Sequence, residues 1–114
     1  MKHCEVTYQV ENKVYGFIGL AMRAGKVTFG TESCLDMMQK RKIKLLVIAS
    51  DSSTRTIQNL KQKAEMTKTS YCIIGTKKEL SNAIGKYNKT VLGIKDTNLA
   101  NAIKKLLNGG DVIG

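Results

Sequence analysis

Residues 45–49, Leu-Leu-Val-Ile-Ala, form the longest uninterrupted apolar run in the sequence. A continuous apolar run of this length is typical of a β-strand that is covered on both faces. It is far too short to cross a lipid bilayer. We therefore expect this segment to be a strand with helices packed on both sides of it.

Segments with helical periodicity alternate with short β-prone runs along the rest of the chain. The spacing of apolar residues predicts helices over about residues 12–24, 31–40, 52–66, 76–85 and 96–108. Strands are expected between them, at residues 27–29, 45–49, 70–74 and 89–94. This alternation indicates an α/β fold, and we expect a three-layer α/β/α sandwich around a sheet of about four strands.

Glycine and threonine mark several ends of these helices. Gly25 follows the first predicted helix, in the place of a left-handed cap. Thr76 and Glu79 have the spacing of a capping box at the start of the fourth. Gly16 and Gly19 lie inside the first predicted helix, where we expect them to let a neighbouring backbone approach closely.

The length of the chain, 114 residues of which 42% are hydrophobic, suffices for one core. No proline, repeat or low-complexity linker indicates a boundary, so we expect a single domain over residues 1–114, with residues 1–11 as a mobile extension.

No apolar segment follows Met1, and Cys4, Cys34 and Cys72 are an odd number without CxxC spacing. Reduced thiols and a cytoplasmic location are the simplest interpretation.

Positive charge dominates the sequence: 19 Lys and Arg residues stand against 9 acidic ones, giving a net charge of +10 and a pI near 9.7. Such an excess usually indicates an anionic partner, with nucleic acid first and an anionic membrane surface second. The cations cluster at Lys26, at Lys40, Arg41, Lys42 and Lys44, and at Lys77 and Lys78. Each alone suits a solvated face, but together they favour a nucleic-acid surface, and we expect no membrane partner.

Residues suited to catalysis or metal binding are few. His3 is the only histidine, which argues against Ser-His-Asp, Cys-His and histidine-based metal sites. Residues 19–26 resemble a phosphate-binding loop, but they end a predicted helix, and Val27 stands where Ser or Thr should bind magnesium. Glu32 and Asp36 have the spacing of a carboxylate pair, although the helix dipole also favours acids in a first turn. We expect no enzyme activity, no metal and no cofactor.

The starts of the second and fourth predicted helices, at Thr31 and Thr76, are the expected receptors for phosphate, because unpaired N–H groups point outward there. In an alternating parallel arrangement such starts gather at one edge of the sheet. Two Phe and four Tyr residues form no interleaved platform for stacking a single strand. Structured RNA recognised by its shape is therefore the favoured partner.

Three stretches of the chain resemble the bacterial branch of the ribosomal L7Ae family, small proteins that bind kink-turn RNA. They are IGLAMRAGKVTFGTESCLDMMQKRKIKLLVIASDSS, IIGTKKELSNAIGK and VLGIKDTNLANAIKKLL, which together cover about residues 12–108. The resemblance implies an α/β/α sandwich with a four-stranded mixed sheet, no catalytic activity, and an RNA surface made from two neighbouring loops. We expect a ribosomal or ribosome-associated protein that acts in translation and is a monomer.

The family's first RNA element, Gly-x-Asn-Glu-x-x-Lys, falls on residues 30–36, and only Gly30 is kept. Glu32 stands where the family has Asn, Ser33 where it has Glu, and Asp36 where it has Lys. Glu32 can still accept from a guanine amino group, whereas Asp36 cannot replace a cation that faces phosphate. The second element, an apolar residue, a Ser and a helix start, falls on Ile74, Gly75, Thr76 and Lys77.

These matches and the basic clusters define an expected RNA surface. The cluster from Lys40 to Lys44 lies within reach of flanking phosphates if the strand after it runs back toward the same ligand, since a helix of roughly 15 Å separates it from Gly30. The expected RNA-binding residues are Lys26, Gly30, Thr31, Glu32, Ser33, Asp36, Lys40, Arg41, Lys42, Ile74, Gly75, Thr76 and Lys77.

Two other functions compete with RNA binding. A family member that has lost kink-turn specificity would act as a protein-interaction module, and the altered first element favours this alternative. A small nucleotide-binding enzyme is supported only by the alternation of helices and strands.

Overall fold

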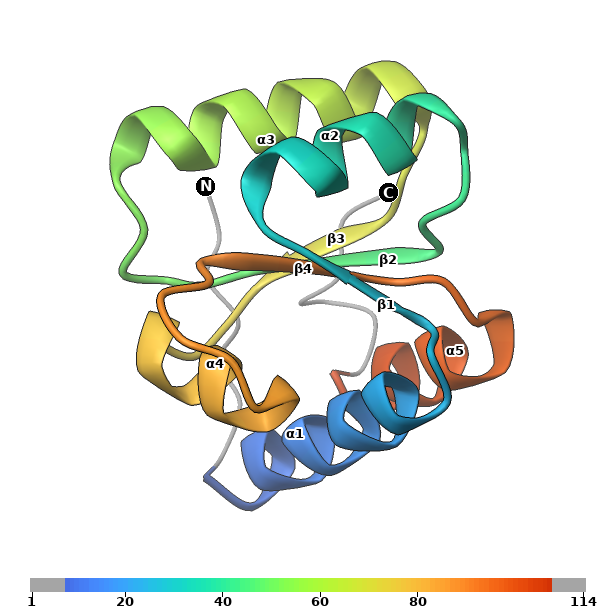
Figure 1. Cartoon of the computed structure of the whole chain (residues 1–114), viewed down its shortest axis with the longest axis vertical. Helices are drawn as coiled ribbons and strands as arrows, with labels where there is room; N and C mark the ends of the chain where they lie inside the picture. The colour runs from blue at the N-terminus through green and yellow to red at the C-terminus, as the bar shows by residue number, and fades with distance from the viewer. Residues whose placement is uncertain (1–7, 108–114) are drawn as a thin grey trace.

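Helices and strands alternate throughout residues 8–107, the part of the chain that the computed structural model describes (Figure 1). The helices are α1 (Tyr8–Arg23), α2 (Thr31–Gln39), α3 (Thr54–Thr67), α4 (Lys77–Ile84) and α5 (Thr97–Leu106). The strands are β1 (Val27–Phe29), β2 (Leu45–Ile48), β3 (Tyr71–Ile73) and β4 (Val91–Ile94). Their order confirms the predicted alternation.

The four strands form one sheet in the order β1-β4-β2-β3. Strand β4 is antiparallel to both of its neighbours, and β2 is parallel to β3. Strands β1, β2 and β3 therefore run in one direction, and β4 runs against them. Helices α2, α3 and α4, which follow these three strands, consequently begin at the same end of the sheet (Figure 1). The expected four-stranded mixed sheet is confirmed.

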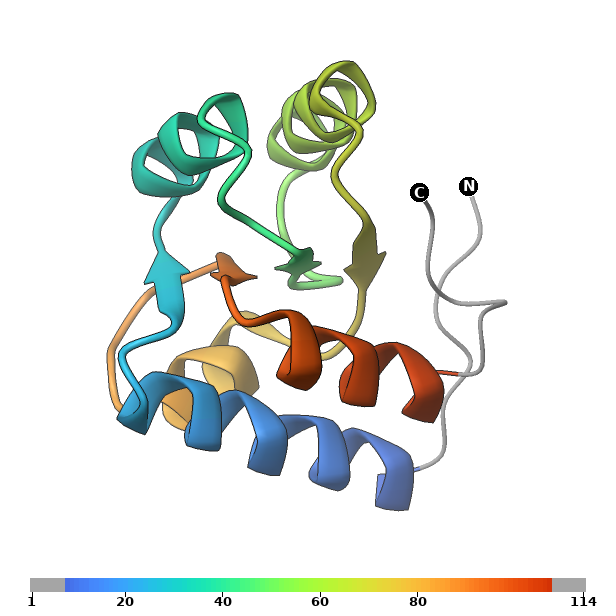
Figure 2. The same cartoon turned by 90° about the vertical axis from the view of Figure 1, so that its right-hand side faces the viewer.

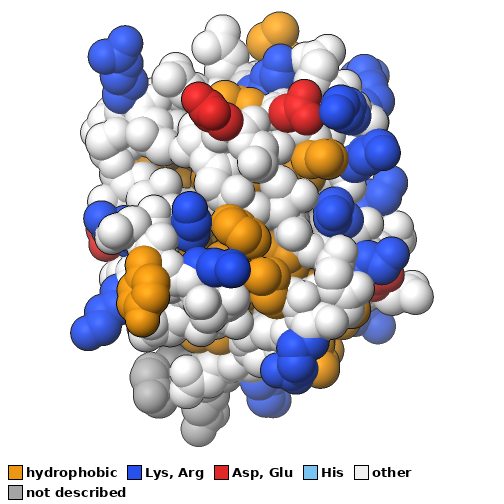
Figure 3. Space-filling model, viewed as in Figure 1, with side chains coloured by type: hydrophobic (Ala, Val, Ile, Leu, Met, Phe, Trp, Pro, Cys, Tyr) orange, Lys and Arg blue, Asp and Glu red, His pale blue; other side chains and the backbone are white. Residues whose placement is uncertain are grey.

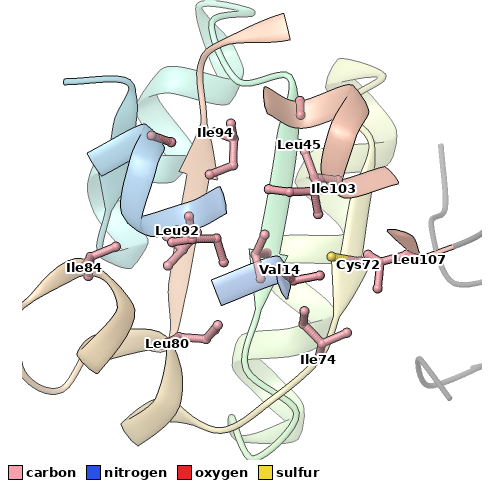
Figure 4. Packing of buried hydrophobic residues seen from close by; sticks show 14 of the residues in the cluster. Val14, Leu45, Cys72, Ile74, Leu80, Ile84, Leu92, Ile94, Ile103 and Leu107 are labelled. Carbon is pink, nitrogen blue, oxygen red and sulfur yellow. The ribbon is translucent and has the colours of Figure 1, made fainter. Parts of the chain in front are cut away.

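Helices cover both faces of the sheet, which gives the three layers seen in Figure 2. Helices α2 and α3 lie on one face, and α1, α4 and α5 lie on the other (Figure 1). Strand β2 contributes Leu45 and Val47 to the core beneath α1, part of which is drawn in Figure 4. It contributes Leu46 and Ile48 to the core beneath α2. All four side chains are fully buried, as expected for the apolar run.

The first helix begins earlier than expected. Helix α1 starts at Tyr8, so the predicted mobile extension at residues 1–11 overlaps it at residues 8–11. The rest of that extension lies outside the described residues, as does residue 108, where the fifth predicted helix ends. None of the helices between residues 8 and 107 is long and apolar enough to cross a lipid bilayer.

The glycines of α1 differ in what surrounds them. A Cβ on Gly19 would lie 3.5 Å from the carbonyl oxygen of Ala83 in α4, so the backbone of α4 does lie beside Gly19, but at an ordinary contact distance that an alanine could also make. Gly16 has no such neighbour within 4 Å, so the same expectation is wrong for it. Gly25, after the helix, has the predicted left-handed conformation, with a φ of 71°.

Gly93, in the middle of β4, allows close packing on the α2 side of the sheet. It pairs with Thr28 of β1 and with Leu46 of β2. A Cβ at this position would lie 2.5 Å from Cδ1 and 2.9 Å from Cγ1 of Ile43. Ile43 is buried in the core beneath α2, so the missing side chain makes room for it.

Gly93→Ala should therefore destabilise the protein. The added Cβ forces Ile43 from its position, and overpacking of this kind lowers the free energy of unfolding by about 1–3 kcal/mol, as measured by urea denaturation. Adding Ile43→Val should recover part of the loss. Gly16→Ala is the control: it lies on an open helix face and should raise the free energy of unfolding by roughly 0.5–1 kcal/mol. Unchanged stability in Gly93→Ala would contradict the close packing.

Candidate nucleic-acid interface

Strands β1, β2 and β3 end at the same end of the sheet, at the left of Figure 1, where β4 begins between β1 and β2. Backbone hydrogen bonds join these ends: Gly30 N donates to Val91 O at 3.1 Å, and Ser50 N donates to Gly75 O at 2.8 Å. Because β4 and β2 lie between β1 and β3, the first and last of these ends are about 14 Å apart. We call this surface the helix-start end; it comprises residues 30–33, 49–51, 75–77 and 85–90.

Helix α2 begins at this end without a side-chain cap. Its N-cap residue, Gly30, has a φ of 89° and a ψ of 150°, a conformation essentially restricted to glycine. Gly30 offers no side-chain acceptor to the N–H groups of the first turn. Thr31 is half-buried, and Glu32 and Ser33 are exposed. The start of α2 is therefore open to an incoming acceptor, such as a phosphate oxygen.

Helix α4 begins with its first turn already hydrogen-bonded. Thr76 Oγ1 accepts from Glu79 N at 3.1 Å, and Glu79 Oε1 accepts from Thr76 N at 3.1 Å, which confirms the predicted capping box. Lys77 N donates to Asp51 Oδ1 at 2.8 Å. A carboxylate of the protein therefore already occupies this helix start, and the expectation that Thr76 marks a phosphate receptor stays a prediction that requires a phosphate to displace Asp51. The Lys77 side chain remains exposed there.

The turn before α4 rests on α1. The Tyr15 hydroxyl donates to Glu79 Oε1 at 3.2 Å. Burial raises the pKa of Tyr15, as do the charges of Glu11 and Glu79, so the phenol stays protonated and remains a donor. Gly75 has a φ of 65°, and a Cβ on it would overlap the Tyr15 hydroxyl. Ile74 is only 1% exposed and its side chain lies in the core (Figure 4), so the expected RNA contact at this position stays a prediction that the side chain does not support.

A basic loop at residues 85–90 lies beside the start of α2 and is missing from the residues expected above. Phe29, the last residue of β1, immediately precedes Gly30. Lys86 and Lys89 each hold Nζ 5.4 Å from the centroid of the Phe29 ring. These contacts place two cations next to the open helix start.

Tyr87, between these two lysines, is 85% exposed on an anchored loop. Ser81 Oγ accepts from Lys89 N at 2.8 Å and donates to Lys89 O at 3.2 Å. Asn88 takes a left-handed conformation, with a φ of 56°. An exposed ring held between cations is suited to stack on an unpaired base. The run Lys-Tyr-Asn-Lys could have indicated this loop from the sequence.

The remaining basic residues of the expected surface lie at the opposite end of the sheet. Lys26 precedes β1, and Arg41 and Lys42 precede β2, whereas Gly30 follows β1. Figure 3 shows Lys and Arg side chains gathered along the right-hand edge, where β1, β2 and β3 begin in Figure 1. We call this surface the lysine end; it comprises Lys26, Arg41, Lys42, Lys44, Lys68 and Lys95.

The two ends are separated by the length of α2, about 13 Å. Strand β2 does run back toward the helix-start end, as the sequence-based prediction required. The cations that precede β2 nevertheless stay at the opposite end, where the strand begins. The structure therefore does not bring Lys26, Arg41 and Lys42 together with Gly30. A ligand at the helix-start end reaches these cations only if it extends past α2.

Asp36 and Lys40, two further expected site residues, pair with each other on the surface of α2. Lys40 Nζ lies 3.1 Å from Asp36 Oδ2, and both side chains are exposed. An exposed pair at i,i+4 contributes only about 0.3–0.5 kcal/mol. It balances the charge of Lys40 in the free protein, yet a phosphate can separate it at little cost.

Catalytic and metal chemistry find little support in the described part of the chain. Burial raises the pKa of the Cys34 thiol to about 12, and Sγ donates to Thr28 O at 3.6 Å. This thiol is therefore protonated at neutral pH and a poor nucleophile. Between residues 8 and 107, no three His, Cys, Asp or Glu side chains are grouped so that they could hold a metal ion. His3 and Cys4 lie outside these residues.

The chain has relatives over most of its length. The family described as "Ribosomal protein L7Ae/L30e/S12e/Gadd45 family" matches residues 12–104. The "RNA-binding protein YlxQ" of Enterococcus faecium is 34% identical over 97 residues, which cover 85% of this chain and 93% of that protein. The protein of the same name from Bacillus subtilis (strain 168) is 28% identical over 94 residues, which cover 82% and 94%.

Two solved structures share the fold. A protein with unknown function from Bacillus halodurans C has a TM-score of 0.80 and 27% identity, and the match covers 84% of this chain and 97% of that one. A Giardia lamblia 15.5kD RNA binding protein has a TM-score of 0.79 and 18% identity, with 93% and 90% covered. The second likeness is one of fold alone. Both support the expected α/β/α sandwich.

Glu79→Ala should loosen the turn before α4. It removes the acceptor for Thr76 N and for the Tyr15 hydroxyl, so we expect the free energy of unfolding to fall by about 1–2 kcal/mol in chemical denaturation. Lys78→Ala, its exposed neighbour in the same helical turn, should change it by less than about 0.5 kcal/mol. Equal effects of the two substitutions would contradict the role of Glu79 as the anchor of this turn.

Proposed function

Because this chain belongs to the ribosomal protein L7Ae/L30e/S12e/Gadd45 family, we propose that it is a non-catalytic RNA-binding protein. Its ligand, in this proposal, is a structured RNA of the kink-turn type, bound at the helix-start end, and the protein works with ribosomal RNA or the ribosome. The net charge of +10 supports an RNA partner. So do the names of the two YlxQ relatives, both RNA-binding proteins.

The observation that carries the proposal is the placement of the open start of α2 beside the loop at residues 85–90. The N–H groups after Gly30 can donate to phosphate or base oxygens. Tyr87 can stack on a base that is splayed out of the RNA helix, while Lys86 and Lys89 meet the backbone on either side of it. Structured RNA with an unpaired base provides both kinds of contact.

The altered motif limits what this end recognises. Glu32 can accept a hydrogen bond from a guanine amino group, as an amide oxygen can, but it cannot donate one. Asp36 brings negative charge to a position next to the RNA and pairs with Lys40. We therefore propose that the chain binds kink-turn RNA more weakly than a variant with Asn in place of Glu32 and Lys in place of Asp36 would.

A protein-interaction module is the second candidate function. The ion pair between Asp36 and Lys40 favours it, because it balances the charge of a cation that an RNA-binding surface would leave free. Fluorescence anisotropy with a kink-turn RNA duplex separates the two candidates. Binding of the duplex that is displaced by competitor RNA supports RNA recognition, and failure to bind any RNA supports the module.

Glu32→Asn combined with Asp36→Lys should strengthen kink-turn binding. The pair of changes removes two acids, adds a cation, and supplies donors that can meet a base edge or a phosphate. Since hydrogen bonds to charged groups contribute roughly 1.5–3 kcal/mol, affinity should rise at least about tenfold. The variant loses the pair between Asp36 and Lys40 and sets two lysines at i,i+4, while it relieves the repulsion between Glu32 and Asp36, so the free energy of unfolding should fall by no more than about 1 kcal/mol.

The control for this variant is the same duplex without the kink, measured at one salt concentration. It gains only from the added charge and should therefore improve less than the kink-turn duplex. Equal gains on both duplexes would show that the start of α2 does not distinguish a kink-turn, and that charge alone accounts for binding.

Tyr87→Ala should weaken binding of the kink-turn RNA without changing stability. Loss of one stacked base corresponds to about 1–3 kcal/mol, or roughly 5- to 150-fold in the dissociation constant. Tyr87→Phe keeps the ring and should bind as the original chain does. If alanine and phenylalanine have the same effect, the ring makes no stacking contact.

A further inference from the structure

A row of cations crosses the whole lysine end, beside every strand of the sheet. In spatial order, Lys26 precedes β1, Lys95 follows β4, Lys44 precedes β2, and Lys68 lies at the end of α3 just before β3. Backbone hydrogen bonds fix these neighbours, since Lys95 N donates to Lys26 O at 2.8 Å and Lys44 N donates to Ile94 O at 2.7 Å. With strands about 4.8 Å apart, the row is about 14 Å long.

Two adjoining hollows follow this row. One, of about 350 Å³, is lined by Gly25 and by Lys26, Arg41, Lys42, Lys44 and Lys95. The other, of about 230 Å³, is lined by Arg41, Ile43, Lys44 and residues 67–70. Both are lined by Arg41 and Lys44, so they adjoin at these two residues, and we call the two hollows together the groove. Among the described residues, no acidic side chain lines this groove, and none of the six cations of the lysine end is ion-paired.

Two of these cations occupy backbone positions that favour glycine. Arg41, after α2, has a φ of 58°, and Lys68, after α3, has a φ of 56°. Helices α1 and α4 are followed by Gly25 and Gly85 in the equivalent left-handed conformation. A left-handed conformation is unfavourable for residues with a Cβ, and such strain tends to persist at functional sites. Both strained residues line the groove.

Stabilisation of helix ends accounts for only part of this charge. Helices α1, α2 and α3 all end at the lysine end, where a cation interacts favourably with the helix dipole. Arg41 and Lys68 fit that role. Lys44 and Lys95 flank strands instead, and Asp96, the acid nearest to them in sequence, is used to cap α5 by accepting from Leu99 N at 2.8 Å. The groove is thus left with unbalanced positive charge.

We propose that the lysine end is a second RNA-binding site, which holds the phosphate backbone of a segment distinct from the one at the helix-start end. The inference rests on the proposed function and extends it. The lining consists of cations, hydroxyl groups and one buried isoleucine, without an aromatic ring or an amide side chain to read a base. Contacts of this kind position an RNA without reading its sequence.

The two sites divide the work of recognition. The helix-start end offers an exposed ring and an open helix start, which suit an irregular RNA element. The lysine end offers a row of charge that suits a regular backbone. Because the sites lie at opposite ends of the sheet, one protein molecule holds either an RNA that passes along α2 or two separate segments.

The test compares two triple variants with the same net charge. Lys26→Gln, Lys44→Gln and Lys95→Gln remove three adjacent cations of the four in the row, whereas Lys13→Gln, Lys61→Gln and Lys105→Gln remove three lysines from α1, α3 and α5. The probe is the kink-turn duplex extended by a long flanking helix. The first variant should lose at least about tenfold in affinity near 0.1 M salt, and its log-log salt slope should become shallower by about 2. The second should lose less than about threefold.

The outcomes separate this inference from the proposed function. If the original chain binds the RNA and Tyr87→Ala weakens it, but the two triple variants behave alike, the proposed function stands and the second site is refuted. If the lysine-end variant keeps its RNA affinity but loses binding of polyglutamate or of tripolyphosphate, the groove serves an acidic protein or a small polyphosphate, and the inference is wrong. If the original chain binds no RNA, both fail.

Arg41→Gly provides an independent test, because it removes strain and charge together. The melting temperature should rise by roughly 2–6 °C, while affinity for the extended duplex falls about 3- to 10-fold. Arg41→Lys keeps both the charge and the strained backbone, and it should retain most of the affinity at an unchanged melting temperature. A more stable Arg41→Gly variant with unchanged RNA affinity would overturn the proposal.

Discussion

The two halves of the molecule are joined through strand β2, which is hydrogen-bonded on both edges and buried on both faces. Its register sets Leu45 opposite Ile94 of β4 and Leu46 opposite Tyr71 of β3. Both cores pack against its side chains. The reversed direction of β4 beside it places the loops after β1, β2 and β3 at one end of the sheet and the basic segments before them at the other. The direction of the strands, and not the local sequence, therefore decides which residues lie at the helix-start end and which lie at the lysine end.

Much of the fold could be predicted because its signals are local. The apolar run at residues 45–49 required cover on both faces, and the spacing of Thr76 and Glu79 fixed the start of α4. Strand direction is a non-local property, and periodicity does not encode it. The starts of α2, α3 and α4 do gather at one end of the sheet, because β1, β2 and β3 share a direction. Strand β4, which separates β1 from β2, runs against them, so α5 begins at the other end.

The candidate site was less predictable because it depends on contacts between distant segments. Asp51 closes the start of α4 from 26 positions away, which no reading of the Thr76 motif could reveal. Ile74 follows a strand, and its side chain is buried in the core. Tyr87 becomes a candidate ligand contact only because its loop lies next to Gly30, which is far from it in the sequence. By contrast, the i,i+4 spacing of Asp36 and Lys40 was visible in the sequence.

The support that Tyr15 gives to the turn before α4 has a consequence for how this surface forms. Tyr15 and Glu79 are 64 positions apart, so the turn takes its shape only in part from its neighbours in the chain. Its hydrogen bonds are complete only when the first helix has docked, and we therefore expect the opening of the turn and of the helix to be coupled. A ligand that binds the turn stabilises the N-terminal helix by thermodynamic linkage, although it touches no residue of that helix.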